Sequence, residues 1–311
     1  MFIFKSLKIP KKFMGSVLAI GNFDGVHLGH QRVINEAKKN AKKLNCNFGI
    51  LTFEPHPKCF FKKKYNFFRL TPLNEKLEIF RSMGINFVIN LKFNDKLSLI
   101  SANEFLDNFL VKSLKVRHVV TGFDFVFGNK QKGNVSMIKK FSEDTKKFKY
   151  TCVSEFKKRG LEISSSNIRK LLKSGNLSKA NFLLSRNWKI CSRVVQGEKK
   201  AREIGFKTAN LNIDKYSELC FGVYEVSIFI EEKKSEFLGI ANYGIKPTFN
   251  KKKPLLEIHI FNFNKEIYGK KIYVTFKKFI RNEKKFDTVA KLKEQITNDI
   301  KKLKKENEKF F

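Results

Sequence analysis

Residues 17–30 of the chain are VLAIGNFDGVHLGH, and this stretch decides the fold of the amino-terminal half. Its first four residues are apolar and predict a buried strand, and the glycine-rich segment 21–30 leads directly into a helical pattern. Glycines let a backbone approach a polyanion, and the first N–H groups of a helix are available to bind it. Because His27 and His30 are three residues apart, both imidazoles can face one ligand. The stretch therefore predicts a phosphate-binding turn between a strand and a helix.

Strands and helices alternate on both sides of this turn, which predicts an open α/β sheet of parallel strands. Such a sheet binds ligands beyond the carboxyl ends of its strands. A capping box is expected where Ser101 is followed three residues later by Glu104, and two short helices, 167–173 and 178–184, are expected as the hinge between two modules. We expect strands at 17–20, 48–53, 87–91, 118–121 and 149–153, and helices at 31–44 and 74–83.

The pattern changes after Trp188 to short β-type runs without intervening helices, which is typical of a small antiparallel barrel. A carboxy-terminal helix is expected over 288–308, with Val289, Leu292, Ile296 and Ile300 forming an apolar stripe that packs on the barrel. We therefore expect two domains, at 1–184 and 185–311. The barrel strands are expected at 190–195, 223–229, 238–242, 255–261 and 272–279.

The composition is strongly basic, with a formal net charge of +35 over 311 residues. Such a charge can indicate a nucleic-acid or membrane partner. The lysines, however, are spread from Lys5 to Lys309, and abundant Lys, Asn, Ile and Phe are typical of an AT-rich genome. We expect no dedicated nucleic-acid partner and no membrane span, and five scattered cysteines without a C-x-x-C pair favour a reduced, cytoplasmic protein.

The string 21–30 matches the nucleotidyltransferase signature G-x-F-D-G-x-H-x-G-H, and the chain resembles the prokaryotic bifunctional riboflavin kinase/FAD synthetase family. The resemblance continues through TFEPHP at 52–57, GFDFVFG at 122–128 and ISSSNIR at 163–169. It covers nearly the whole chain. The resemblance implies an enzyme that phosphorylates riboflavin to FMN and adenylylates FMN to FAD, using ATP and Mg²⁺ in both steps.

In the first domain the resemblance implies that His27 and His30 hold the ATP phosphates, while Arg169 clamps the triphosphate and the departing pyrophosphate. In-line transfer between phosphates needs charge neutralisation and alignment rather than an enzyme nucleophile. The ATP and phosphate ligands expected here are Gly21, Asn22, Phe23, Asp24, Gly25, Gly29, Ser165 and Ser166. Phe53, Phe123, Asp124 and Phe125 are expected to border the flavin ring, although core packing explains each phenylalanine equally well.

In the second domain, GFKTANL at 205–211 resembles the riboflavin kinase signature G-F-P-T-A-N. Thr208 and Asn210 offer the neutral oxygen ligands that suit Mg²⁺ beside ATP. Glu257 alternates with Leu256 and Ile258 along its strand, so its carboxylate can face the substrate and act as the base for the ribityl hydroxyl. The resemblance further implies that Gly197 and Gly205 contact ATP and that Arg281 contacts the flavin.

Two departures from the family pattern fall beside these residues. Ala201 and Arg202 stand where the family has Gly-Arg, and Lys207 stands where it has proline. Lysine removes the restraint on φ and adds a cation next to the phosphates. One alternative is therefore an FAD synthetase whose kinase module is impaired; another, of a different class, is a basic nucleic-acid-binding protein. The sequence leaves the oligomeric state open.

Overall fold

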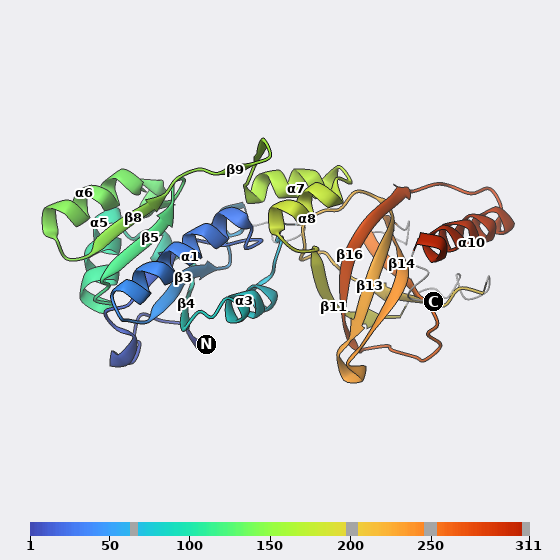
Figure 1. Cartoon of the computed structure of the whole chain (residues 1–311), viewed down its shortest axis with the longest axis horizontal. Helices are drawn as coiled ribbons and strands as arrows, with labels where there is room; N and C mark the ends of the chain where they lie inside the picture. The colour runs from blue at the N-terminus through green and yellow to red at the C-terminus, as the bar shows by residue number, and fades with distance from the viewer. Residues whose placement is uncertain (63–67, 197–204, 246–253, 307–311) are drawn as a thin grey trace. The chain divides into compact units, whose positions relative to one another are not determined.

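A computed structural model describes residues 1–62, 68–196, 205–245 and 254–306, which form two compact units (Figure 1). The first unit comprises Met1–Tyr65 and Thr71–Ser165, and the second comprises Asn66–Leu70 and Ser166–Phe311. Residues 166–184, which we expected in the first domain, thus cluster with the second unit. The functional boundary after residue 184 stays a prediction.

The first unit is built on a six-stranded parallel sheet with strand order β1-β4-β3-β2-β5-β8. The five expected strands are confirmed to within one residue at each end. The edge strand β1 was not predicted, because it is three residues long and two of them, Phe2 and Ile3, are exposed. The strands are β1 (Phe2–Phe4), β2 (Val17–Ile20), β3 (Phe48–Glu54), β4 (Phe87–Lys92), β5 (His118–Gly122) and β8 (Lys149–Val153).

Helices bury both faces of this sheet. Along β2, Val17 and Ala19 belong to one apolar cluster, and Leu18 and Ile20 belong to another on the opposite face. A strand covered on both sides is continuously apolar, and this explains the run VLAI. The first cluster includes α1 (Leu28–Lys43) and α3 (Leu73–Ser82); the second includes the π-helical segment η2 (Phe105–Ser113) and α6 (Val135–Thr145), which was not predicted.

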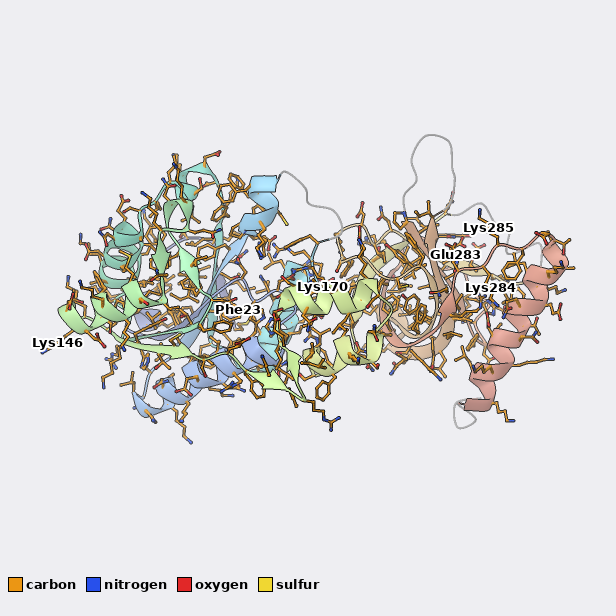
Figure 2. All side chains as sticks on the ribbon, turned by 90° about the horizontal axis from the view of Figure 1, so that it is seen from above. Phe23, Lys146, Lys170, Glu283, Lys284 and Lys285 are labelled. Carbon is orange, nitrogen blue, oxygen red and sulfur yellow. The ribbon has the colours of Figure 1, made fainter. Side chains whose placement is uncertain are left out.

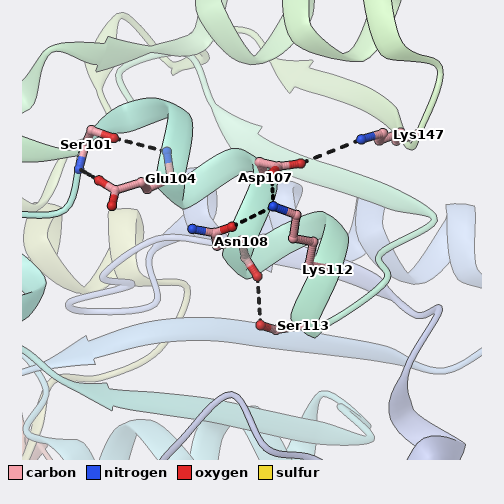
Figure 3. Close-up of polar contacts among 7 residues, drawn as sticks. All are labelled: Ser101, Glu104, Asp107, Asn108, Lys112, Ser113 and Lys147. Carbon is pink, nitrogen blue, oxygen red and sulfur yellow. Dashed lines mark hydrogen bonds and ion pairs between the residues drawn. The ribbon is translucent and has the colours of Figure 1, made fainter.

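The expected capping box is present at the start of α5 (Ala102–Glu104). The Ser101 hydroxyl accepts the Glu104 N–H at 3.1 Å, and the Glu104 carboxylate accepts the Ser101 N–H at 2.8 Å (Figure 3). One turn later, Asp107 pairs with Lys112 at 2.6 Å and with Lys147 at 3.6 Å. The short elements of this unit are η1 (Lys11–Phe13), α2 (Pro57–Lys62), α4 (Asp95–Ser98), β6 (Val126–Phe127), η3 (Asn129–Gln131), β7 (Gly133–Asn134), β9 (Lys157–Lys158) and β10 (Leu161–Glu162).

The second unit contains a closed antiparallel barrel with strand order β11-β12-β15-β14-β13-β16. The expected barrel is confirmed, and it includes one strand, β12, that was absent from the expected set. Two helices, α7 (Ser165–Lys173) and α8 (Leu177–Leu184), precede the barrel as predicted. The strands are β11 (Lys189–Val195), β12 (Thr208–Leu211), β13 (Gly222–Ile230), β14 (Ser235–Ile245), β15 (Pro254–Ile260) and β16 (Lys271–Asn282), with η4 (Glu231–Lys233) between β13 and β14.

The carboxy-terminal helix α10 (Val289–Glu306) packs on the barrel through its second half (Figure 1). Ile300 packs on a cluster with Val223 and Ile240, as the apolar stripe predicts, and Leu303, which was not in the predicted stripe, belongs to the same cluster. The expectation for Val289 was wrong, because this side chain at the first turn is 63% exposed.

The positive charge is distributed over both units. The lysines labelled in Figure 2 lie at the end of α6, on α7 and in the segment between β16 and α10, and each of them is exposed. In the described part of the chain, no helix is both long and apolar enough to cross a membrane. The labelled lysines are Lys146, Lys170, Lys284 and Lys285.

Candidate active sites

The first candidate site is the turn 21–30, which joins β2 to α1 at the carboxyl edge of the sheet. Its backbone is strained, because Phe23 and Val26 have positive φ angles of 51° and 41°. Gly25, with φ of 88°, adopts a conformation that only glycine reaches without cost. The Phe23 ring is buried and meets the Phe80 ring edge to face, so the main chain of Phe23 is the part that can reach a ligand.

The two histidines of the turn lie together, as their spacing predicts. Their rings are stacked with centroids 3.6 Å apart and planes 18° apart. His27 is the N-cap of α1, and its Nδ1 accepts the His30 N–H at 3.3 Å. In neutral His27 the ring proton is therefore on Nε2. A histidine pair at a helix N-terminus can donate hydrogen bonds to an anion and help to neutralise its charge.

Neighbouring segments hold the turn in this shape through its polar main-chain and side-chain groups. The Ser165 hydroxyl donates to the Asp24 carbonyl at 2.8 Å, and the Thr71 N–H donates to the Asp24 carboxylate at 3.1 Å. The Gln31 amide donates to the Val26 carbonyl at 2.9 Å. Ser165, expected as a phosphate ligand, thus supports the turn from the first residue of α7.

Aromatic side chains follow the carboxyl ends of two strands adjacent to β2. Phe123, after β5, is 49% exposed, and the neighbouring Asp124 is exposed as well. Phe125 instead stacks on Phe127 with centroids 5.6 Å apart and packs toward the core. At the end of β3, Phe53 meets Phe93 edge to face. Of these expected flavin contacts, Phe123 has the most ring surface available.

Ser166 and Arg169 belong to the second compact unit. The Arg169 guanidinium lies 4.1 Å from the centroid of the Phe68 ring, and its Nε donates to the Phe68 carbonyl at 2.8 Å. Ser166 is exposed. A role for these two residues at the ATP phosphates stays a prediction.

The second candidate site is a row of polar residues on the outer face of the barrel. Glu257 of β15 is paired directly with Asn210 of β12 on one side and with Asn242 of β14 on the other. The next pair on this face is Thr208 with His259. Directly opposed side chains have Cβ atoms about 4.5–5.5 Å apart. The expected metal ligands and the expected base are therefore cross-strand neighbours, while Leu256 and Ile258 point into the core.

One oxygen in this row has no hydrogen-bond partner within the described part of the chain. Asn210 is 4% exposed, and its Oδ1 is buried without a donor among the described residues. A buried acceptor of this kind suits a hard cation. Thr208 and Asn210 line a groove of about 80 Å³ together with Lys207 and Tyr268, which is room for only part of a nucleotide. Among the described residues, no cluster of three or more His, Cys, Asp or Glu side chains forms an alternative metal site.

The loop before β12 is described only in part. Gly205 has φ of 91°, which requires glycine. The Lys207 carbonyl lies 2.9 Å from Nδ1 of His259, and its ammonium donates to the Asn264 carbonyl at 3.5 Å. The expected ATP contact Gly197 and the departures Ala201 and Arg202 lie outside the described residues.

A larger cavity of about 490 Å³ opens beside the end of β16. Phe221 and Tyr243 line it with rings stacked 5.3 Å apart. Glu283 also lines it, and burial together with the negative charge of Glu257 raises the pKa of the Glu283 carboxyl. Arg281, expected at the flavin, points its guanidinium to the buried Asp299 of α10 at 2.8–2.9 Å.

Two family models match the chain over consecutive segments: FAD synthetase over residues 9–167 and riboflavin kinase over residues 184–306. A bifunctional riboflavin kinase/FMN adenylyltransferase of Buchnera aphidicola from Schizaphis graminum is 41% identical over 295 residues, which is 93% of each chain. The enzyme of the same name from Bacillus subtilis is 37% identical over 91% of this chain and 90% of its own.

The chain belongs to the bifunctional riboflavin kinase/FMN adenylyltransferase family. It is an enzyme with an FAD synthetase domain and a riboflavin kinase domain, and its substrates and products are riboflavin, FMN, FAD and ATP. A crystal structure described as a macrolide-efflux protein from Streptococcus pneumoniae has the same fold, with a TM-score of 0.84 and 28% identity over 96% of this chain and 97% of that one.

In both domains, residues that sequence reasoning missed lie next to the candidate sites. In the FAD synthetase domain, the Thr52 hydroxyl and the Lys76 ammonium both donate hydrogen bonds to the Asn22 carbonyl of the turn. The signal for Lys76 was present, because it shares a helix face with Phe80 four residues later, and a lysine on an apolar face needs a polar partner. In the riboflavin kinase domain, Asn242 was missed because only the strand register places it beside Glu257.

Proposed function

We propose that the turn 21–30 binds the ATP triphosphate and that the first unit transfers the adenylyl group to FMN. The observation that carries this assignment is the stacked pair His27 and His30 at the N-terminus of α1. A phosphate oxygen of FMN attacks the α-phosphorus, the bond to the β-phosphate oxygen breaks, and pyrophosphate leaves. The histidines and the first N–H groups of the helix stabilise the charge that develops. Arg169 and Ser166 are proposed to hold the pyrophosphate.

The isoalloxazine ring of FMN is proposed to lie beside Phe123 and the aromatic cluster at the ends of β3 and β4. Phe93 lies at the centre of this cluster, with ring centroids 5.3 Å from Phe60, 5.7 Å from Phe61 and 6.4 Å from Phe53. Phe61 is 62% exposed, so its ring is available for a planar ligand. Sheet order supports the placement, because β3 and β5 flank β2 and its turn.

For the kinase reaction we propose that Glu257 takes the proton of the ribityl terminal hydroxyl as that oxygen attacks the γ-phosphorus of ATP; the bond from the γ-phosphorus to the bridging β-phosphate oxygen breaks, and ADP leaves. Asn210 and Asn242 are the cross-strand neighbours of this glutamate. The Thr208 hydroxyl and the Asn210 Oδ1 are proposed to hold Mg²⁺, which when bound neutralises charge on the ATP phosphates. The cavity lined by Phe221 and Tyr243 is proposed to take the flavin ring of riboflavin.

Incubation of the purified chain with riboflavin, ATP and MgCl₂, with FMN and FAD separated by chromatography over time, tests the proposal. FMN should appear first and FAD later, and omission of Mg²⁺ should stop both steps. If supplied FMN is converted to FAD while riboflavin remains unphosphorylated, the kinase assignment is wrong. We also propose a cytoplasmic enzyme without a dedicated nucleic-acid partner; a steep salt dependence of duplex DNA binding would contradict the second point.

A further inference from the structure

A lysine is buried beneath the phosphate-binding turn. Lys76, on α3, has no exposed surface and is among the largest fully buried side chains of the described residues. Burial of an ammonium group in a protein interior is costly unless hydrogen bonds compensate it. The position faces the same apolar cluster as Phe80, where an aliphatic side chain would pack without that cost. Packing alone therefore does not explain why this residue is a lysine.

Its ammonium group contacts the first bend of the turn. Nζ donates to the Asn22 carbonyl at 3.0 Å and to the Thr52 hydroxyl at 3.4 Å. The Thr52 hydroxyl, which is also fully buried, lies 3.4 Å from the same Asn22 carbonyl. One carbonyl of the turn thus meets donors from two elements, α3 and β3. A hydrogen bond from a charged donor is stronger and more directional than one from a neutral donor.

The residue that follows Asn22 is the one that needs such support. Phe23 has φ of 51°, and a bulky residue keeps a positive φ only where the surrounding structure imposes it. The bond from Lys76 fixes the peptide group between Asn22 and Phe23, and with it the direction of the Phe23 N–H. Further along the turn, the Ser165 hydroxyl donates a hydrogen bond to the Asp24 carbonyl. The Gln31 amide donates one to the Val26 carbonyl.

We propose that Lys76 is a positioning residue for adenylyl transfer: its buried ammonium holds the Asn22 carbonyl and so presets the turn for the ATP phosphates. This inference rests on the proposed phosphate site at the turn. Lys76 touches the turn from the core side, and its effect on the reaction passes through the backbone of Asn22 and Phe23. Its positive charge also lies beneath the site and favours a polyanion there.

The test is Lys76→Met in the full-length chain, with initial rates of FAD formation from FMN titrated separately against MgATP and against FMN. Loss of one charge-assisted hydrogen bond should lower kcat/KM for MgATP about 10- to 100-fold. The change should include a higher KM for MgATP, with the KM for FMN within about two-fold of the parent. A merely destabilised protein would lose active fraction and kcat without a change in KM.

Two controls accompany this variant. Riboflavin phosphorylation by the same protein should be unchanged, because the kinase site lies in the other unit. Lys38→Met removes a surface lysine of the same unit whose ammonium bonds the Met83 carbonyl at 3.3 Å, and it should leave FAD formation unchanged. Lys76→Gln, whose amide is too short to reach the Asn22 carbonyl, should repeat the defect of Lys76→Met.

An unchanged KM for MgATP in a folded Lys76→Met or Lys76→Gln protein overturns the proposal. Loss of the folded first unit in both variants, seen by circular dichroism and melting, assigns Lys76 a structural role and also overturns it. A parent chain that makes no FAD from FMN would instead refute the proposed function of the turn. The two failures are therefore distinguishable.

Discussion

Lys207 departs from the family motif without altering the fold. It stands where the family motif has proline, yet the strand that follows it, β12, pairs with β15 in regular register. Its carbonyl is held by His259 and its ammonium lies in the groove of Thr208 and Asn210. The hydrogen bond from the histidine restrains this loop, and the lysine adds a cation where ATP phosphates are proposed to bind.

We therefore expect Lys207→Ala and Lys207→Pro to weaken the use of MgATP by the kinase. The loss should be about two- to five-fold in KM, because an exposed charge contributes roughly 0.2–1 kcal/mol. The measurement is a titration of MgATP at saturating riboflavin, with Lys270→Ala as control, since Lys270 pairs with Glu232. Stronger binding by Lys207→Pro would show that loop rigidity outweighs the charge, and identical curves would show that the departure is neutral.

Glu257→Gln tests the proposed base. Glutamine keeps the size of the side chain but cannot accept the hydroxyl proton, so FMN formation should fall about 10²- to 10⁴-fold. Adenylylation of supplied FMN should stay within two-fold of the parent, because it uses the other unit. Glu236→Gln, at an exposed position of β14 in the same barrel, is the matched control. A kinase rate equal to that of the parent would remove Glu257 from the mechanism.

At the scale of elements, the local sequence pattern was sufficient to predict a helix or strand where that element buries its own apolar residues. The run 17–20, the alternation around Glu257 and the helix now described as Val289–Glu306 were predictable for this reason. The edge strand Phe2–Phe4 was not, because it forms by pairing with β4, more than eighty residues away along the chain. β12 was missed as well: its four residues TANL carry little periodicity, and the barrel closes through their partners on β11 and β15.

The contact between α10 and the barrel includes a buried ion pair. The guanidinium of Arg281 reaches the Asp299 carboxylate at 2.8 Å, and the two side chains are 17% and 7% exposed. Asp299→Ala leaves a cation that is largely buried without its partner, and this should lower the free energy of unfolding by about 3–5 kcal/mol. Chemical denaturation followed by far-UV circular dichroism measures the loss.

The exposed pair Lys291 and Asp287 provides the comparison for this variant, because Asp287→Ala should change the free energy of unfolding by about 1 kcal/mol or less. Equal effects of the two substitutions would mean that the Arg281 pair does not fasten the helix. If Asp299→Ala also impairs riboflavin binding, Arg281 has a second role at the flavin, as the family resemblance implies.

For the whole molecule, motifs gave the candidate residues for each reaction, but not how those residues are arranged. The spacing of Thr208, Asn210 and Glu257 along the chain does not place them side by side; the antiparallel register of β12, β14 and β15 does. Similarly, the support of the turn by Lys76 depends on α3 packing beneath β2 and β3. Strand register and helix packing depend on the whole domain, so local sequence patterns could not predict them.

Because the two candidate sites lie in different units, we expect that mutations can separate the two reactions and that mixing the variants can restore the sequence from riboflavin to FAD. His30→Ala should make FMN but almost no FAD, because the histidine pair at the start of α1 is broken. Glu257→Gln should make FAD only from supplied FMN. An equimolar mixture of these two variants should convert riboflavin to FAD after a lag, since FMN must leave one molecule and accumulate before another binds it. Chromatography of samples taken over time, with each variant alone as control, measures this recovery. If each variant retains its own reaction but the mixture makes no FAD, FMN must pass between sites of one molecule; if His30→Ala loses both products, the sites are not separate.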